Sequence, residues 1–426
     1  MVKIIGKRVL AVVCVLVIIG GGLCFSSRLT VNKASREQYE QFFQTEQEFD
    51  VLFLGSSHMI NGVSPIDLFC EYGITSYNLS MHGNYVASSY YLLKESLGLL
   101  EKKGRQLPKV VVLDIYGGGE TVFDLHNAWD SFPLSPVKVE MAKALVPKED
   151  QAAMVAPFFL YHNRWSELKK EDFRLYASRK YGVQPRYEMC YPAEEIIRNP
   201  EDMETADEEK LDYLSRINEL CESQGIRLIL IHIPYTYHPE WQREANAVCQ
   251  YATEQGMVCI NFMNQDIGID FEIDFYDQGH LNAVGMRILT RELGKILTKA
   301  GAEDHRGQPE EQIWREESQQ FLKYRIMQLE LVKDGKAYLM GIHDPDLVSI
   351  VQITEAALDD GQIVKLVERL KEAGNEIRVA KELIEVYQED GSVKKYDIYC
   401  QVYGKDSPDE PVHTAGFSLD ITFPSV

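Results

Sequence analysis

A serine, a histidine and an aspartate in this sequence have the types and the local settings that nucleophilic catalysis needs. Ser57 follows the apolar run 51–54, and Asp277 and His280 lie three positions apart in a polar segment far downstream. A serine hydroxyl is a weak nucleophile unless a positioned base takes its proton. A histidine serves as that base when a carboxylate holds its ring and its tautomer. We therefore predict that Ser57 is a nucleophile, His280 its base and Asp277 the residue that orients the base.

A plainer interpretation gives both segments a structural role. Glycine and serine after a strand often form only a turn, and an aspartate–histidine segment often forms only a loop before a helix. Asn282 suits the N-cap of a helix that starts at Ala283. The place of Ser57 just past a predicted strand favours catalysis, because open α/β sheets hold their sites beyond the carboxyl ends of their strands.

The order of these motifs resembles that of the SGNH (GDSL-like) hydrolase family over residues 50–300. The family's Gly-Asp-Ser block corresponds to residues 55–57, and its Asp-x-x-His block corresponds to residues 277–280. The resemblance therefore implies a serine hydrolase with a catalytic Ser57, His280 and Asp277. It also implies a flavodoxin-like parallel sheet sandwiched by helices, without a cofactor.

An oxyanion site is a further implication of the resemblance. Segment 78–83 is similar to the family's second block, so the N–H of Gly83 would bind the oxyanion together with the N–H of Ser57. The asparagine of the third block is absent after the apolar run at 110–115. Asn84 and Tyr116 are the candidates to replace it, and Asn84 is also a candidate substrate-binding residue.

Apolar runs and helical patterns alternate between residues 50 and 300, which predicts an α/β fold with a parallel sheet between helices. Ser64, Pro65 and Gly73 are typical start and stop signals for one of the helices. The predicted strands are 51–55, 76–80, 110–115, 226–232 and 257–261. The predicted helices are 65–72, 86–102, 208–223, 241–255 and 283–299.

Residues 117–207 are too many for an ordinary connection and are rich in aromatic side chains. They predict an insertion near the carboxyl edge of the sheet. In one interpretation, His162, Arg164 and Trp165 bind substrate, with Trp165 stacked on a sugar and Arg164 on an anion. In the other, the insertion is a small cap with its own aromatic core, because aromatic side chains most often pack.

The first 25 residues are predicted to be a membrane anchor. Lys3, Lys7 and Arg8 precede the uncharged run 9–25, a length near the lower limit for crossing a bilayer, and basic flanks favour the cytoplasmic side. A cleaved signal peptide is the alternative. Either way, the bulk of the chain is expected outside the cytoplasm, after a polar juxtamembrane segment at 26–49.

Charge and cysteine content exclude several classes of function. A net charge of −21 argues against nucleic acid, which is bound mainly through lysine and arginine. The cysteines show no C-x-x-C spacing, and no histidine or carboxylate cluster has ligand spacing, so no metal is expected. Most cysteines lie among apolar neighbours, so we expect buried free thiols, with one disulfide as the alternative.

The last part of the chain has a different pattern. Residues 301–319 are predicted to be a linker, and 320–426 a small α+β domain of unknown role. Asp334-Gly335 and Asp390-Gly391 predict two hairpins, at 326–343 and 383–403. A helix is expected at 362–373 and a last strand at 414–423.

Taken with the single anchor, the resemblance is closest to membrane-anchored D-alanyl and O-acetyl transfer proteins of bacterial envelope polymers. It implies an extracytoplasmic serine esterase or O-acyltransferase that acts on acyl esters of cell-envelope glycans, beside a multi-spanning membrane acyltransferase. The alternative is a non-catalytic envelope-assembly or glycan-binding module on a degenerate hydrolase fold, which the missing third-block asparagine favours.

Overall fold

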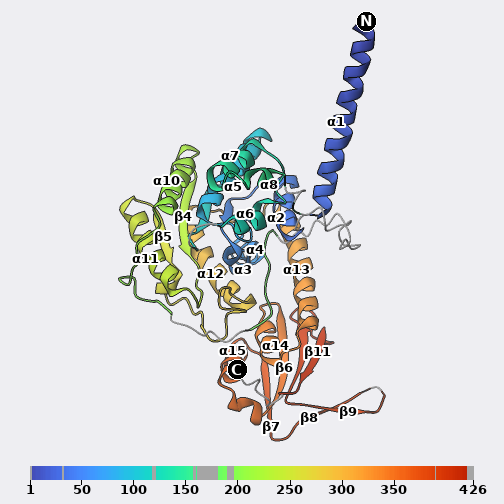
Figure 1. Ribbon diagram of the computed structural model, residues 1–426. Helices are drawn as coiled ribbons and strands as arrows, with labels where there is room; N and C mark the ends of the chain where they lie inside the picture. The colour runs from blue at the N-terminus through green and yellow to red at the C-terminus, as the bar shows by residue number, and fades with distance from the viewer. Residues whose placement is uncertain are drawn as a thin grey trace.

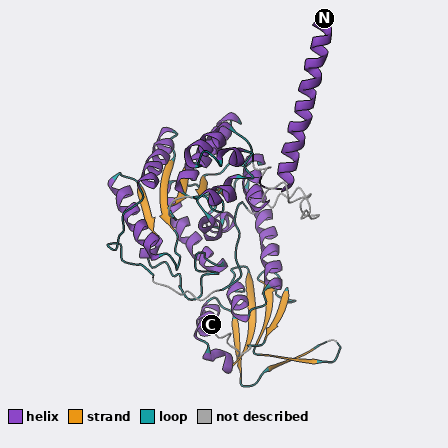
Figure 2. Cartoon of the chain, in the orientation of Figure 1, coloured by secondary structure: helices purple, strands orange, loops and turns teal. Residues whose placement is uncertain are grey.

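The chain forms an α/β fold with a five-stranded parallel sheet at its centre (Figures 1 and 2). The computed structural model describes residues 2–30, 33–117, 121–156, 160, 181–189, 196–388 and 390–419. The strand order is β2-β1-β3-β4-β5, and every neighbouring pair is parallel, as in flavodoxin-like folds. The strands are β1 (Val51–Leu54), β2 (Ser76–Asn78), β3 (Val110–Asp114), β4 (Arg227–His232) and β5 (Val258–Asn261).

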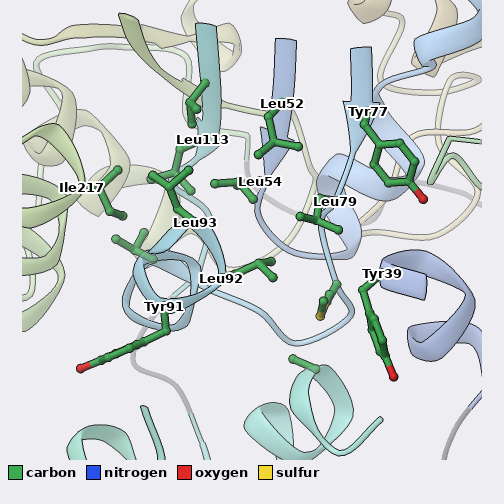
Figure 3. Packing of buried hydrophobic residues seen from close by; sticks show 14 of the residues in the cluster. Tyr39, Leu52, Leu54, Tyr77, Leu79, Tyr91, Leu92, Leu93, Leu113 and Ile217 are labelled. Atoms are coloured by element: carbon green, nitrogen blue, oxygen red, sulfur yellow. The ribbon is translucent and has the colours of Figure 1, made fainter. Parts of the chain in front are cut away.

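Helices cover both faces of this sheet. Leu52 and Leu54 of β1 point to one face, where they join the core built with α5 (Figure 3). Val51 and Phe53 point to the other face. A strand buried on both faces has no polar side, which is why it appears in the sequence as an unbroken apolar run. The first face is covered by α2 (Lys33–Gln44), α5 (Val86–Lys102), α10 (Glu208–Ser223) and α11 (Pro239–Glu254), and the second by α3 (Ser57–Gly62), α4 (Pro65–Tyr72) and α12 (Ala283–Ala300).

The predicted start and stop signals of α4 are confirmed. The Ser64 side chain accepts a hydrogen bond from the Asp67 N–H, and Pro65 is the first helical residue. Gly73 ends the helix with a φ of 71°, in the left-handed region. The predicted bounds of α5 and α10 also match those of the structure.

The first described part of the insertion, residues 121–156, is largely helical and packs on the first core. Its helices are α6 (Val122–Trp129), α7 (Pro136–Leu145) and α8 (Gln151–Val155). Trp129, Met141 and Met154 are fully buried in that core. The expected substrate-binding residues His162, Arg164 and Trp165 lie outside the described residues.

The N-terminal segment contains two helices, α1 (Val2–Thr30) and α2. Figure 1 shows α1 extending away from the rest of the chain, and its side chains from Leu10 to Ile19 are largely exposed. The predicted juxtamembrane segment, 26–49, contains α2, on which Tyr39 and Phe42 are buried. Among the residues that the structure describes, no helix meets the combined length and hydrophobicity needed to cross a bilayer.

A second sheet follows the first in the chain (Figure 2). Its strand order is β11-β10-β6-β7, and a two-stranded hairpin, β8-β9, extends from it. The strands are β6 (Leu347–Thr354), β7 (Glu376–Ala380), β8 (Ile384–Tyr387), β9 (Val393–Tyr396), β10 (Ile398–Gly404) and β11 (His413–Phe417). The helix α15 (Gly361–Glu372) packs against this sheet, and we call residues 347–417 the C-terminal unit.

The hairpin predicted around Asp334-Gly335 is wrong. Two helices occupy this region, α13 (Glu311–Leu331) and α14 (Gly335–Gly341). The Asp334 side chain accepts a hydrogen bond from the Ala337 N–H, so Asp334 is a helix N-cap rather than a turn residue. The same two residue types favour both structures, and tertiary packing decides between them.

The expected linker at 301–319 is likewise only partly irregular, because α13 begins at Glu311. Trp314 and Phe321 on α13 are buried in the first core, and Leu329 is buried in the core of the C-terminal unit. Charged residues on the exposed side of α13 give this segment its polar composition.

The expectation of free thiols is wrong for one pair of cysteines. Cys249 on α11 and Cys259 on β5 form a disulfide, with their Cα atoms 5.3 Å apart. Cys221 and Cys400 are free and buried, as expected.

Asp114, the last residue of β3, generates a prediction about stability and pH. Its side chain is buried, and burial raises its pKa to about 7. Because this folded-state pKa lies above that of an unfolded aspartate, its contribution to stability is complete below about pH 4 and is lost as the pH rises through about 7. In the variant Asp114→Asn the side chain is neutral at every pH, so its stability should not show this decrease as the pH rises.

Between pH 4 and pH 8, the wild type should therefore lose about 3 kcal/mol more unfolding free energy than Asp114→Asn does. Urea unfolding at a series of pH values measures this difference. Asp212→Asn, which removes a charge at a half-exposed position on α10, is the control. Parallel curves for Asp114→Asn and the wild type would contradict the buried acid.

Candidate active site

Ser57 lies at the carboxyl end of β1, where the chain turns sharply into α3. Ser56 is the N-cap of α3, and its side chain accepts a hydrogen bond from the His58 N–H. Gly55 has a φ of 146°, and a Cβ at this position would lie 2.9 Å from the Cβ of Asp114 on the next strand. The turn therefore needs a glycine before the two serines, and it leaves the Ser57 side chain at the edge of the sheet.

The structure brings Ser57, His280 and Asp277 together in one chain of hydrogen bonds. The Ser57 Oγ lies 2.7 Å from the His280 Nε2. The His280 Nδ1 lies 2.8 Å from the Asp277 Oδ1 and 3.0 Å from its Oδ2. A carboxylate cannot donate, so Nδ1 carries the proton and Nε2 is free to accept the Ser57 hydroxyl proton.

Asp277 is held ready as a charged acceptor. Burial alone would raise its pKa, but hydrogen bonds from His280 and from the Gly279 N–H outweigh burial and lower that pKa below the ordinary value. Its carboxylate also accepts the Gly279 N–H at 2.8 Å. The loop is held from the outside by Thr236, whose N–H donates to the Gln278 carbonyl oxygen at 2.7 Å.

Two backbone donors remain free beside the serine. Among the residues that the structure describes, the N–H groups of Ser57 and Gly83 donate to no protein acceptor. Gly83 has a φ of 73°, and a Cβ there would meet the Asp124 carbonyl oxygen at 2.8 Å. The tight turn at Gly83 thus needs glycine, and the N–H groups of Ser57 and Gly83 are both available to an oxyanion.

The structure does not make Asn84 available as a further donor. Its side chain is fully buried, with Nδ2 donating to the Ser89 Oγ at 2.7 Å and Oδ1 accepting from the Trp129 Nε1 at 3.3 Å. Both ends of the amide are used to tie α5 to α6. The expectation that Asn84 replaces the missing asparagine or contacts substrate is therefore not met.

Tyr116, the other candidate donor, lies close to the serine turn. Its ring stacks on His58 with centroids 3.5 Å apart, and its hydroxyl is hydrogen-bonded to the hydroxyl of Tyr237. Burial raises the pKa of Tyr116 far above the ordinary value, so its hydroxyl keeps its proton. Tyr237 also lies against Gly279 in the Asp277 loop, where a Cβ would meet its ring at 3.1 Å.

Sequence reasoning did not predict two side chains that surround His280. The ring of Tyr276 stacks on His280 with centroids 5.3 Å apart, and the Arg186 guanidinium lies 4.9 Å from the centre of that ring. The Arg186 carbonyl oxygen accepts from the Ala283 N–H at 2.8 Å, which fixes segment 181–189 beside the start of α12. In the sequence, the only sign that Tyr276 lies near His280 is that it directly precedes Asp277.

Burial lowers the pKa of three other histidines near the site. His58 is fully buried, and burial together with His280 and His232 holds its pKa well below the ordinary value. Burial lowers the pKa of His82, although a hydrogen bond with Gln184 opposes this shift. His232 is buried at the end of β4, where burial lowers its pKa to about 3.

A group of possible metal ligands lies at the opposite end of the sheet. Asp50, Glu303 and His305 have ligand atoms within 4.8 Å of one another. The Lys109 Nζ already contacts both carboxylates, at 3.1 Å and 2.8 Å. This lysine balances the acidic charge, so the group is a structural ion-pair network before β1.

Solved structures that are similar to this chain include a lipase and an esterase. A GDSL-like lipase from Bacteroides thetaiotaomicron is 12% identical, and the alignment covers 63% of this chain and 98% of the lipase with a TM-score of 0.31. The psychrotrophic esterase EstA from Pseudoalteromonas sp. is 12% identical, with coverage of 59% and 97% and a TM-score of 0.30. No family model and no curated protein match the sequence. At these TM-scores the similarity adds no argument about activity, which rests on the geometry of the site.

The backbone at Gly55 generates a prediction about the serine turn. Gly55→Ala introduces a Cβ at a strained φ and against Asp114, so we expect it to lower the unfolding free energy by about 1–3 kcal/mol. Gly98→Ala is the matched control, because Gly98 lies on α5 with open space around it. In a helix that change should stabilise by up to about 1 kcal/mol. Chemical denaturation measures both, and equal effects would refute the geometric role of Gly55.

Proposed function

We propose that this protein is a serine esterase or O-acyltransferase in which Ser57, His280 and Asp277 are the catalytic triad. The observation that supports it most is the unbroken chain of hydrogen bonds from Ser57 through His280 to Asp277. The free N–H groups of Ser57 and Gly83 support it further, because an acyl transfer needs donors for the developing oxyanion.

In the first half of the reaction, the Ser57 Oγ attacks the carbonyl carbon of an ester while the His280 Nε2 takes the hydroxyl proton. A tetrahedral intermediate forms, and its oxyanion accepts from the N–H groups of Ser57 and Gly83. The intermediate collapses as the bond to the leaving alcohol breaks and His280 returns the proton to that oxygen. The product is an acyl ester on Ser57, with Asp277 stabilising the imidazolium throughout.

In the second half, a hydroxyl group from water or from a sugar attacks the acyl ester. His280 takes the proton of that hydroxyl and then gives it to the Ser57 Oγ, which leaves as the free serine. Loss of one oxyanion donor is worth about 3–4 kcal/mol of barrier in such reactions. Tyr116 does not supply a third donor in this arrangement, because its hydroxyl is already hydrogen-bonded to that of Tyr237, so the oxyanion relies on the N–H groups of Ser57 and Gly83.

We further propose that the substrate is an acyl ester of a cell-envelope glycan, and that a multi-spanning membrane acyltransferase supplies the acyl group. The resemblance to membrane-anchored transfer proteins supports this choice. Transfer to a sugar hydroxyl needs the acceptor to be positioned, because bound hydroxyls react at effective concentrations that free water does not reach.

Covalent labelling tests the triad. A fluorophosphonate should label the wild-type protein, and Ser57→Ala should lose all labelling because the attacking oxygen is gone. Ser96→Ala is the matched control, since Ser96 is another buried serine, bonded to the Leu92 carbonyl oxygen, and should label normally. Persistent labelling of Ser57→Ala would refute the assignment of the nucleophile.

The same preparation separates the two fates of the acyl group. With a chromogenic acyl ester and an envelope glycan, mass spectrometry should find acylated glycan that forms only with intact Ser57. Free acid alone would make the protein an esterase. Absence of both labelling and turnover would favour the non-catalytic glycan-binding module.

We also propose that residues 9–25 hold the protein at the membrane, with the bulk of the chain outside the cytoplasm. Two observations support this location. Side chains such as Leu16 and Ile18 on α1 are exposed apolar groups that a membrane would cover. The disulfide between Cys249 and Cys259 belongs to oxidising compartments.

A topology reporter tests the location. Alkaline phosphatase fused after the last residue should be active, because it needs an oxidising compartment, and deletion of residues 1–25 should abolish that activity. Cys249 and Cys259 should also resist alkylation in whole cells until a reductant is added. An inactive phosphatase in the full-length fusion would refute the proposed location.

A further inference from the structure

The loop that carries Asp277 and His280 closes at Asp274. The Asn282 N–H donates to the Asp274 carbonyl oxygen at 2.9 Å, and the Tyr276 N–H donates to the His280 carbonyl oxygen at 3.0 Å. These two bonds form the stem of a short loop, which we call the catalytic loop (residues 274–282). A displacement of Asp274 would therefore also move Asp277 and His280, which lie between the two ends of this stem.

The side chain of Asp274 is held by the C-terminal unit. Arg369 on α15 makes two hydrogen bonds to the Asp274 carboxylate, with Nη2 lying 3.0 Å from Oδ2 and Nη1 bonded to Oδ1. The Asp274 carboxylate is fully buried, and it also accepts the Asp270 N–H at 2.8 Å. A paired guanidinium and carboxylate fix both distance and orientation, which a single contact cannot do.

Two other residues on the same face of α15 hold the segment just before the catalytic loop. The Gln362 Nε2 donates to the Glu272 carbonyl oxygen at 2.7 Å, and the Lys365 Nζ lies 2.9 Å from a carboxylate oxygen of Asp270. Gln362, Lys365 and Arg369 are spaced by three and four residues, so they lie along one side of the helix. One helix of the C-terminal unit thus holds residues 270–274 at three points.

The geometry points to a role for the C-terminal unit, and we propose that Arg369 is a positioning residue for the catalytic loop. By holding Asp274, Arg369 sets where His280 and Asp277 lie relative to Ser57. This inference rests on the proposed function. In catalysis a displacement of about 1 Å can lower turnover by about 100-fold, so a distant contact of this kind can affect the reaction.

Simple attachment of the two sheets is the competing explanation. A second buried arginine provides the comparison, because Arg325 on α13 donates to Asp344 and Asp346 just before β6. Arg325 holds the segment that leads into the C-terminal unit, and its hydrogen bonds go to residues outside the catalytic loop. Arg325→Met and Arg369→Met therefore make the same chemical change, but only Arg369→Met removes hydrogen bonds to the catalytic loop.

The test compares kcat, KM and Tm for a small chromogenic acyl ester in the full chain. Arg369→Met should lower kcat by about 10- to 100-fold with KM within about threefold of the wild type, since alignment and not binding is lost. Arg369→Lys should recover part of kcat. Arg325→Met should lower Tm by as much or more and keep kcat within about threefold. Equal kcat for the two methionine variants would overturn the proposal.

Amide hydrogen exchange across the catalytic loop gives a readout that does not depend on activity. Exchange should quicken in Arg369→Met and stay at the wild-type rate in Arg325→Met. If the wild type has no turnover but this exchange pattern holds, the proposed function fails and Arg369 still holds the loop. Unchanged exchange in Arg369→Met would overturn the positioning role whether or not the wild type turns over.

Discussion

The candidate site depends on one hydrogen bond between residues that are 223 positions apart, Ser57 and His280. Such a bond forms only if the end of β1 and the start of α12 meet at the same edge of the sheet. The packing of α12 against α3 and α4 brings them together, with Leu289 and Leu293 buried against the second face. The Ser64 N–H also donates to the Thr290 Oγ1 at 3.0 Å. The short distance between the Ser57 Oγ and the His280 Nε2 is therefore a result of packing α12 against the sheet.

Most of the central fold could be predicted from the sequence, because its signals are local. Strands buried on both faces are unbroken apolar runs, and helices such as α4 carry their own caps. The C-terminal part was harder to predict. Asp334-Gly335 suits a tight turn as well as an N-cap. Trp314 and Phe321 lie in a polar segment, so their burial on α13 becomes evident only when their partners in the core are known. β6 and β7 were not predicted, although β6 has the alternation of buried and more exposed side chains that is typical of a half-buried strand.

The proximity of Ser57, His280 and Asp277 could be predicted, because each lies in a motif with a recognisable order. Their surroundings could not be predicted in the same way. Arg186 reaches Tyr276 from segment 181–189, and Tyr116 meets His58 from the end of a neighbouring strand. The asparagine at position 84 has a donor amide in a suitable place along the chain, yet its neighbours Ser89 and Trp129 engage both of its ends. Contacts between separate segments decide these cases, and a single sequence contains no local trace of them.

The helix α13 has a consequence for how the molecule unfolds. One end of this continuous helix buries Trp314 against Phe69, with ring centroids 4.8 Å apart, and the other end buries Leu329 in the second core. Because α13 is one continuous helix that packs in both cores, unfolding of either core removes packing that stabilises the helix and, through it, the other core. We therefore expect the two sheets to unfold together and not as two independent modules. Proteolysis or gene truncation that removed the second sheet would leave a remnant with an exposed apolar helix end, a substrate for cellular quality control.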